Sequence, residues 1–376
     1  MKSSISRILS SLVVLAALLA FAAPALAVHP DERSEVENLR KRIEALEADK
    51  ERPDAPLVLE ALSKKLRLTG LLELEAAYAR TEGGDESSDL ALATAQLGIE
   101  ATLNDHISGH IILLHEEDQS VVVDEAVITL GCASSYCPGD FSLAGGKMYL
   151  PFGNFNSHFI SDPLTLELGE TNNTALYFGW AVADRVDLKL GVFSGETDTV
   201  GDNDTIDSWV ASLEGSPFEG LTLGASYLSD LAESDIGLVN DTAVDGDLYR
   251  SSVPGAAAYL TATCGPFTLE GEYVTATRSF DAPVTAAAID DERDLTGKKP
   301  SAWNVELALA PNDRWEVAVK AEGADDFQDD LNRYGAVLSY GLFQSTVVGL
   351  EYLLADQRSG DEDRSHIVTA QLAFEF

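Results

Sequence analysis

The sequence predicts an all-β chain: a transmembrane antiparallel β-barrel of about 16 strands, preceded by a signal peptide and a short N-terminal helical segment with coiled-coil character. Three observations predict this fold. Hydrophobicity alternates with a period of two from Lys65 to the C-terminal Phe376. Tight turns alternate with long joints between these segments. The first residues read as an export signal, and no later run is apolar for the ~18 residues that a transmembrane helix needs.

The N-terminus has the composition of a secretory signal peptide. Two basic residues, Lys2 and Arg7, precede an apolar run over 8–23, and an A-x-A cleavage site ends at Ala27. We therefore assign 1–27 to a signal peptide. The alternative is an uncleaved membrane anchor, which the short length of the apolar run disfavours. Export without a later transmembrane helix leaves a periplasmic protein, a secreted protein or an outer-membrane barrel.

Residues 28–56 form a segment of a different kind. Four apolar residues at alternating spacings of three and four make an a/d seam: Val36, Leu39, Ile43 and Leu46. Because a seam of about two heptads is too short to be stable alone, we expect it to hold three barrels together. The alternative is a single amphipathic helix in the periplasm. Pro53 and Pro56 end the segment.

The remainder, 57–376, is expected to be the barrel. Alternating segments predict strands over 65–79, 90–103, 106–116, 121–130, 141–149, 174–183, 185–194, 206–214, 219–229, 255–263, 266–277, 301–310, 313–321, 332–341, 344–354 and 365–376. An even number of strands of about ten residues each is typical of outer-membrane barrels. A soluble sandwich also alternates in hydrophobicity, but it has no reason to alternate short turns with long loops so regularly.

Each strand has an apolar face for lipid and a charged face for a water-filled lumen. Aromatic residues near the turns, such as Trp303, Trp315 and Phe376, would form the interfacial girdles. The predicted charges of the lumen are Arg67, Glu73, Glu75, Arg185, Asp187, Lys189, Glu270, Glu272, Glu306, Glu316, Lys320 and Glu351. Such side chains either set ion selectivity or form a salt-bridge lattice inside the barrel.

The chain is strongly acidic, with 63 Asp and Glu against 25 Lys and Arg and a net charge of −38. Nucleic acid is therefore excluded as a partner, because phosphate backbones need clustered basic residues. Most of the acid lies in the long joints, for example at 196–204 and 230–247. It forms either a solvated outer surface, bridged to lipopolysaccharide by divalent cations, or a vestibule that concentrates cations. We expect no metal site and no cofactor.

Two of the three cysteines, Cys132 and Cys137, flank a turn-like stretch. In an oxidising compartment they are expected to form a local disulfide. A metal site is the alternative, but no histidine or second cysteine pair lies nearby. Cys264 remains without a predicted partner.

The long joint 150–173 differs from the other joints because it is apolar and aromatic. It follows the fifth predicted strand and is therefore the third long loop. An apolar loop is expected to fold inward and to pack on the barrel wall, where it would narrow the pore. Together with Lys147, its polar residues are the candidate constriction and substrate site: Asn154, Asn156, His158, Asp162, Glu167 and Glu170.

The residues from Gly145 to Phe155, with the run from Ile160 to Thr171, resemble the LbtU-type siderophore porins. The segments Leu114–Glu117 and Val123–Ala126 are similar to that family as well, and the resemblance is strongest over about 95–195. The GK-x-x-x-PFG core is shared more loosely with phosphate-, dicarboxylate- and carbohydrate-type porins. The resemblance implies uptake of an iron-loaded siderophore without energy from the inner membrane.

The expected function is passive, TonB-independent passage of a small solute, with a ferric siderophore as the first candidate. The segment before the first strand has too few residues for the plug of an energised receptor. A polycarboxylate siderophore is anionic, so Lys147, Arg185 and Lys189 would have to offset the acid at the constriction. The alternatives are a general cation-preferring porin and a structural or adhesive barrel.

An enzyme is not expected, because none of the six histidines stands in a G-x-S-x-G or similar motif. The predicted location is the bacterial outer membrane, with the N-terminal segment in the periplasm. The expected partners are outer-membrane lipid, lipopolysaccharide, the small-molecule solute and two further copies of the chain in a homotrimer.

Overall fold

The computed structural model describes residues 65–84, 86–117, 119–133, 139–183, 185–197, 199, 205–238, 249, 251–280, 295, 297–328, 330–358 and 364–376. The predicted signal peptide at 1–27 and helical segment at 28–56 lie outside these residues. Cys137 does too, so the predicted disulfide with Cys132 stays a prediction. No helix among the described residues is long and apolar enough to cross a membrane.

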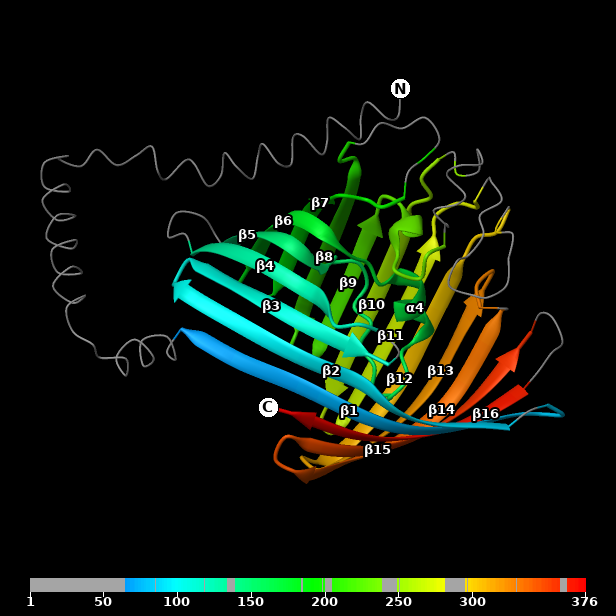
Figure 1. Ribbon diagram of the computed structural model, residues 1–376. Coiled ribbons are helices and arrows are strands. Elements are labelled where there is room, and N and C mark those ends of the chain that lie inside the picture. Colours follow the sequence, from blue (N-terminus) through cyan, green and yellow to red (C-terminus); the bar gives the residue numbers. More distant parts are fainter. Residues whose placement is uncertain are drawn as a thin grey trace, which may run out of the picture.

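Sixteen strands form one closed antiparallel barrel in the described part of the chain (Figure 1). They are β1 Leu66–Thr81, β2 Glu86–Asn104, β3 Ile107–Glu116, β4 Val122–Ala133, β5 Asp140–Tyr149, β6 Asn172–Val182, β7 Val186–Phe193, β8 Ser208–Phe218, β9 Leu221–Leu228, β10 Gly255–Cys264, β11 Phe267–Ala276, β12 Ser301–Asn312, β13 Trp315–Asp325, β14 Leu331–Phe343, β15 Thr346–Gln357 and β16 Arg364–Glu375. The predicted antiparallel barrel of about 16 strands is confirmed, and each predicted strand overlaps one of the sixteen.

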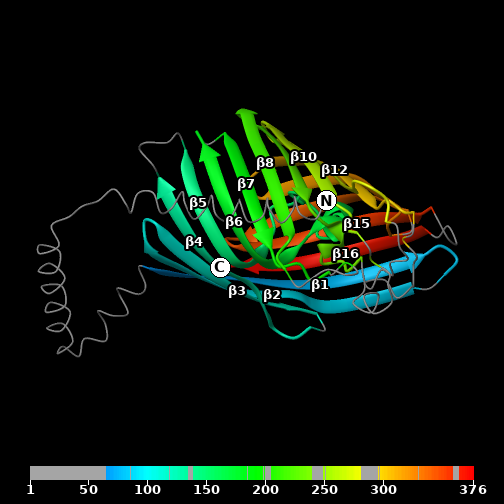
Figure 2. The same ribbon diagram turned by 90° about the horizontal axis from the view of Figure 1, so that it is seen from above.

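The first and last strands close the barrel, since Leu71 of β1 pairs with Glu375 of β16. Both the start of β1 and the end of β16 lie at one end of the barrel, here called the terminal end (Figures 1 and 2). Tight turns join the strands there, as between Cys264 and Phe267. The opposite end carries the long joints and is called the loop end.

The outer face of the barrel is apolar and exposed, as lipid contact requires. On β16, Val368, Leu372 and Phe374 are 37%, 43% and 41% exposed, whereas Thr369 between them is 8% exposed. This alternation confirms the predicted apolar and polar faces of the last strand. Because opposite residues of paired strands share a face, the register extends this division to the neighbouring strands.

The buried apolar core of this protein lies in the lumen of the barrel, against one part of the wall. The loop between β5 and β6 enters the lumen and forms the short helix α4, Leu164–Gly169 (Figure 2). Its Phe152, Leu164 and Leu168 are at most 1% exposed. They pack with apolar residues of other loops, among them Leu231 of the 3-10 helix η2, Leu231–Glu233, and Phe280. These contacts place part of the loop between β5 and β6 in the apolar core inside the barrel.

Candidate functional site

The luminal loop, residues 150–171, enters the barrel through a turn that only glycine fits well. Gly153 has φ +77°, and an added Cβ would lie 2.3 Å from the ring of Phe155. The Gly153 N–H donates to Ser226 Oγ of β9 at 2.8 Å. The first turn of the loop is therefore fixed against β9, four strands around the wall from its parent strand β5.

Glutamates of the wall then accept the backbone N–H groups of the loop. The two carboxylate oxygens of Glu272, on β11, accept from Asn154 N at 2.7 Å and Phe155 N at 3.0 Å. Thr165 Oγ1 donates to the same carboxylate at 3.0 Å. A loop without regular secondary structure leaves its N–H groups without partners, and a charged acceptor satisfies them strongly.

The next two acceptors lie further around the wall. Glu306 of β12 accepts from His158 N at 2.7 Å and from Ser157 Oγ at 2.8 Å. Glu351 of β15 accepts from Ile160 N at 2.7 Å and Ser161 N at 3.1 Å. The loop thus crosses the lumen from β9 to β15 along a row of carboxylates.

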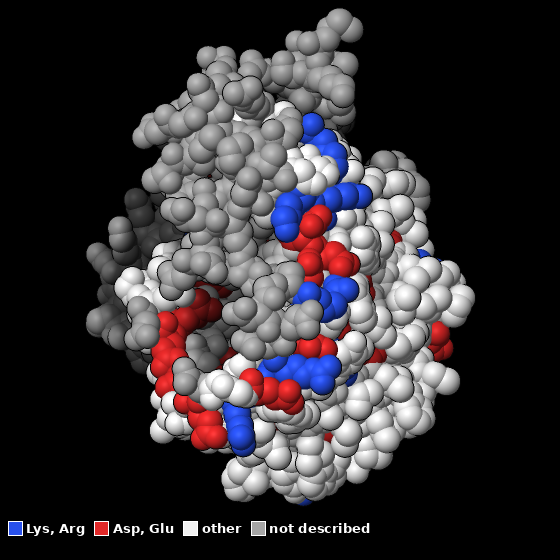
Figure 3. Space-filling model, turned by 90° about the vertical axis from the view of Figure 1, so that its right-hand side faces the viewer, with Lys and Arg blue, Asp and Glu red and all other residues white. Residues whose placement is uncertain are grey.

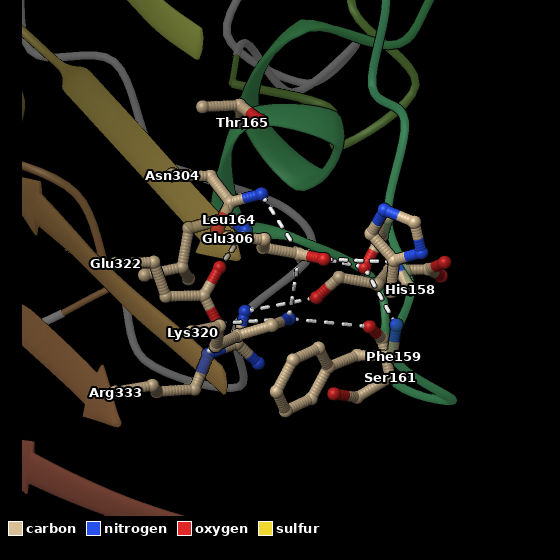
Figure 4. A network of polar contacts seen from close by, with 12 residues as sticks. His158, Phe159, Ser161, Leu164, Thr165, Asn304, Glu306, Lys320, Glu322 and Arg333 are labelled. Carbon is tan, nitrogen blue, oxygen red and sulfur yellow. Dashed lines mark hydrogen bonds and ion pairs between the residues drawn. The ribbon is translucent and has the colours of Figure 1, made fainter. Parts of the chain in front are cut away.

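A buried ion network supports the return of the loop through α4 (Figure 4). Glu322 of β13 accepts the N–H of Leu164, the first residue of α4, at 2.9 Å. The Nζ of Lys320 lies 3.4 Å from Glu322 and 3.8 Å from Glu306, with all three side chains fully buried. Removing one partner from such a buried network is costly, because it leaves another charge without compensation.

Arg333 of β14 completes this network. Its Nε lies 2.7 Å from Glu322, and its Nη2 lies 2.8 Å from Glu167 of α4. The Nη2 group also donates to the carbonyl of Asp162 at 3.1 Å. One guanidinium therefore joins the wall, the helix and the tip of the loop.

Two apolar side chains at the tip fit the wall where glycines leave space. A Cβ on Gly335 would lie 2.8 Å from Phe159 and 2.8 Å from the carbonyl of Tyr352, and a Cβ on Gly349 would lie 3.0 Å from Ile160. The Phe159 ring also lies 4.5 Å from the ammonium of Lys320. Contact with a cation over an aromatic face adds to the attachment of the tip.

The opposite side of the lumen is open and acidic. A cavity of about 360 Å³ is lined by residues of β1, β2 and the end of β3: Glu75, Ala77, Asp89, Ala91, Ala93, Glu116, Glu117 and Gln119. Asp162 is exposed on the loop and close enough to Glu75 for the two carboxylates to repel each other. Acidic side chains surround an opening at the loop end (Figure 3).

Carboxyl groups also gather where the loop leaves the lumen. Burial, with repulsion from Asp235 and Asp162 next, raises the pKa of Glu170 to about 7. Burial likewise raises the pKa of Asp235 to about 6, although its carboxylate accepts from Asn172 N at 2.9 and 3.1 Å. Asp235 N donates to the carbonyl of Glu170 at 2.9 Å. This contact fastens the joint after β9 to the end of the luminal loop.

The structure brings most of the predicted site residues together. Their side chains attach the luminal loop to the wall and do not line the open passage. Glu272 and Lys320 hold the loop, and Glu167 is paired with Arg333. His158 Nδ1 lies 3.0 Å from Glu316, and Glu270 accepts from Thr261 Oγ1 at 2.6 Å. The loop residues that remain exposed are Asn156 and Asp162.

The basic residues expected to offset the acid lie elsewhere, which corrects the sequence-based prediction. Lys147 is on the face of β5 opposite to Met148, a buried core residue, and its Nζ donates to the carbonyl of Val123 at 2.9 Å. Arg185 lies in a turn at the terminal end and donates to Pro217 O at 3.3 Å.

Two other basic residues face the lumen side of their strands but are paired with acids. Lys189 lies 3.3 Å from Asp187. Arg67 lies 3.8 Å from Glu100 near the terminal end. Neither supplies a free positive charge at the luminal loop.

The sequence analysis missed Glu322, Arg333 and Ser226 as site residues. Glu322 lies just beyond the predicted strand 313–321, whereas β13 extends to Asp325. For Ser226 and Arg333, which lie on predicted strands, nothing local indicated a partner in a loop more than fifty residues away. Several buried polar atoms at the site have no hydrogen bond among the described residues, including His158 Nε2, Asn304 Oδ1 and Glu351 Oε1.

Comparison with curated proteins finds distant relatives. The chain is 26% identical over 251 residues to the UPF0422 protein of Coxiella burnetii, covering 63% of this chain and 51% of that protein. It is 23% identical over 99 residues to a UPF0422 protein of Legionella pneumophila, covering 24% of this chain and 19% of that protein. The chain thus spans about half the length of the Coxiella burnetii protein and about a fifth of the Legionella pneumophila protein. No family model matches.

Solved structures share the barrel. The outer-membrane channel DcaP of Acinetobacter baumannii has a TM-score of 0.61 at 12% identity, over 83% of this chain and 97% of that one. OmpF of Salmonella typhi, in complex with daunomycin, has a TM-score of 0.59 at 15% identity, over 83% and 98%. OmpT of Vibrio cholerae, in its trimer form, has a TM-score of 0.51 at 14% identity, over 83% and 99%. The chain therefore has the fold of outer-membrane porins.

Proposed function

We propose that the protein is a passive outer-membrane channel that prefers cationic small solutes, with the luminal loop as its constriction. One observation carries this proposal. Two basic side chains approach the luminal loop, Lys320 and Arg333. Both form buried ion pairs, so neither presents a free positive charge to the passage. The open side of the lumen is lined by the carboxylates of Glu75, Asp89 and Glu116, and in the described part of the chain Glu75 accepts only from the uncharged amide of Gln371 at 2.9 Å. An acid-lined passage with low-dielectric walls concentrates cations and repels anions.

The porin fold supports passage without a catalytic step or an energised plug. The solved neighbours include an outer-membrane channel, and the luminal loop of the described barrel packs with residues of neighbouring joints. A homotrimer, anchored in lipid and lipopolysaccharide with the N-terminal segment in the periplasm, is part of the proposal. The trimer form of OmpT supports the trimer by analogy of fold alone.

Uptake of a ferric siderophore is the second candidate, and it comes from the resemblance of 145–171 to the LbtU-type siderophore porins. The relatives found carry the name UPF0422, so this assignment rests on the motif. The placement of Lys147 and Arg185 away from the loop weakens it for an anionic siderophore. A neutral or cationic siderophore would remain compatible with the acidic passage.

The test is a single-channel recording of the full mature chain in a planar bilayer under a KCl gradient. We expect a reversal potential with the sign for K⁺ and a permeability for K⁺ above that for Cl⁻. Glu75→Gln with Glu116→Gln is expected to reduce this preference. Glu219→Gln is the matched control, because Glu219 is exposed in a turn at the terminal end.

An anion-selective current, or one that Glu75→Gln and Glu116→Gln leave unchanged, would overturn the cation preference. Ferric siderophores added to one side of the same bilayer test the second candidate. A block at micromolar ligand, removed by changes at Asn156 and Asp162, would favour specific uptake. Absence of any current would instead favour a structural barrel.

A further inference from the structure

Among the described residues, the exposed basic side chains of the loop end lie in one part of its rim. Six of them, here called the basic arc, come from the ends of β1, β11, β12, β15 and β16: Arg80, Arg278, Lys298, Lys299, Arg358 and Arg364. Among the described residues, the rim from β2 to β10 offers only Lys147. Figure 3 shows basic and acidic side chains alternating in a stripe along this end.

The basic arc lies just above a band of exposed aromatic side chains on the outer face. Tyr78, Tyr273, Tyr334 and Tyr352 are 41%, 46%, 47% and 42% exposed. Tyr78 precedes Arg80 by two positions on one strand, so both share a face and lie about 7 Å apart along the strand. Aromatic belts mark the level of lipid headgroups. The basic arc is therefore placed at the height of lipid phosphates.

Two arginines of the basic arc form ion pairs with carboxylates at the surface, whereas Arg278 and Arg358 also donate to backbone carbonyls. Arg80 lies 3.6 Å from Glu86, and Arg364 lies 3.3 Å from Asp356. Surface ion pairs contribute little to stability, so a guanidinium can exchange its carboxylate for a phosphate, which it binds with two hydrogen bonds. The carboxylates released are oxygen ligands for a divalent cation that bridges to the next phosphate.

One part of the arc is hollowed. A cavity of about 470 Å³ is lined by Glu82, Asp356, Gln357, Arg358 and Arg364. Two guanidinium groups from different strand ends meet in it, beside carboxylates. We propose that the basic arc is a docking surface for the phosphate groups of an anionic membrane lipid, and that this cavity takes one such phosphate.

The proposal rests on the outer-membrane location in the proposed function, but not on the ion preference of the channel. Arg80 and Arg364 belong to the outer rim, and both form ion pairs with carboxylates of the same rim. Arg80→Gln with Arg364→Gln is therefore expected to leave conductance and reversal potential unchanged. Lipid binding and ion preference are thus measured independently, so the lipid-docking proposal can fail while the proposed cation preference holds, and the reverse.

The experiment measures lipid binding to the full mature chain in maltoside micelles by native mass spectrometry. The probe is bisphosphorylated hexa-acyl lipid A, titrated with Mg²⁺ present. We expect Arg80→Gln with Arg364→Gln to weaken binding about tenfold, because charge-assisted contacts to phosphate are lost. Monophosphoryl lipid A with the same acyl chains is expected to bind more weakly to the native chain. Arg67→Gln with Arg314→Gln, at the terminal end, removes equal charge and is expected to have no effect.

Arg358→Gln is the second variant, although Arg358 also donates to the carbonyls of Ala324 and Asp330. Heat-modified migration on gels checks that each barrel is closed. Equal binding by all variants, or equal weakening by the terminal-end control, would overturn the proposal. Displacement of lipid A by excess inorganic phosphate would also overturn it, since it would show a site for free phosphate instead of a lipid surface.

Discussion

Arg333 of the barrel wall holds Glu167 of the luminal helix, with 2.8 Å between Nη2 and Oε1. The same guanidinium lies 2.7 Å from Glu322, whose side chain is fully buried. Since Glu322 also accepts the N–H of Leu164, the three residues fix where α4 stands in the lumen. The position of α4 beside the passage therefore depends on this arginine, together with the wall glutamates that hold the rest of the loop.

Arg333→Gln is expected to lower the free energy of unfolding by about 3 kcal/mol, because Glu322 and Glu167 lose a buried partner. The loop should also become more mobile, which would appear as larger and noisier single-channel currents. Urea unfolding in micelles and bilayer recordings measure the two effects. Arg314→Gln, at an exposed turn, serves as the control. A variant with native stability and a quiet current would show that the arginine does not hold the loop.

Gly335 gives a second test of how the loop is attached. A Cβ at this position would lie 2.3 Å from Leu353, 2.8 Å from Phe159 and 2.8 Å from the backbone carbonyl of Tyr352. The backbone cannot move away, so Gly335→Ala should displace Leu353 and Phe159 and destabilise the barrel by about 2 kcal/mol. Gly271→Ala is the matched control in a strand, since its Cβ would find Leu260 at an ordinary 3.6 Å. Equal stability of both variants would contradict the proposed contact.

The cation preference should depend on pH through Glu170. Burial raises the pKa of Glu170 to about 7, and Asp235 beside it titrates with a pKa of about 6. Acidification from pH 8 to pH 5 therefore removes negative charge near Glu116 and should reduce the permeability of K⁺ relative to Cl⁻. Reversal potentials at the two pH values measure the change, and Glu170→Gln should flatten it. An unchanged slope in that variant would assign the titration to other groups.

The same raised pKa has a consequence for stability. A carboxyl group whose pKa is higher in the folded than in the unfolded chain favours folding most below its unfolded pKa of 4.5. That contribution is lost as the pH rises through about 7. Hydrogen exchange at the end of the luminal loop should therefore be slower at pH 5 than at pH 8, after correction for the intrinsic rate.

Much of this fold is visible in the sequence because lipid imposes a simple pattern. Val368, Leu372 and Phe374 alternate with polar residues because a strand in the wall must be apolar outside and can be polar inside. The inward course of the third loop follows from its apolar residues, of which Phe152 and Leu164 are buried in the lumen. These features depend on one strand or one loop at a time.

The contacts of the site depend on pairs of residues far apart in the chain, and the sequence does not contain them locally. Glu306 binds the backbone of His158 across 148 positions. Any lumen glutamate would have had the same local pattern. Lys147 was misplaced for a different reason: it follows Gly145 and Gly146, which have no side chains to show which face of β5 is apolar. A register shift between Ile112 and Leu113 adds to the ambiguity in this region.

Cys264 allows the orientation of the barrel in its membrane to be tested. It is an exposed free thiol at the end of β10, beside the turn that leads to β11 at the terminal end. If that end faces the periplasm, a large polyethylene-glycol maleimide added to intact cells should not label it, but should label it once the outer membrane is permeabilised. The labelling is done in a variant with Cys132→Ser and Cys137→Ser, so that Cys264 is the remaining thiol of the chain. Gln357→Cys at the loop end, combined with Cys264→Ser, should label in intact cells. The reverse pattern would place the loop end, with its basic arc and acidic opening, in the periplasm, and the lipid-docking proposal would then fail together with the orientation.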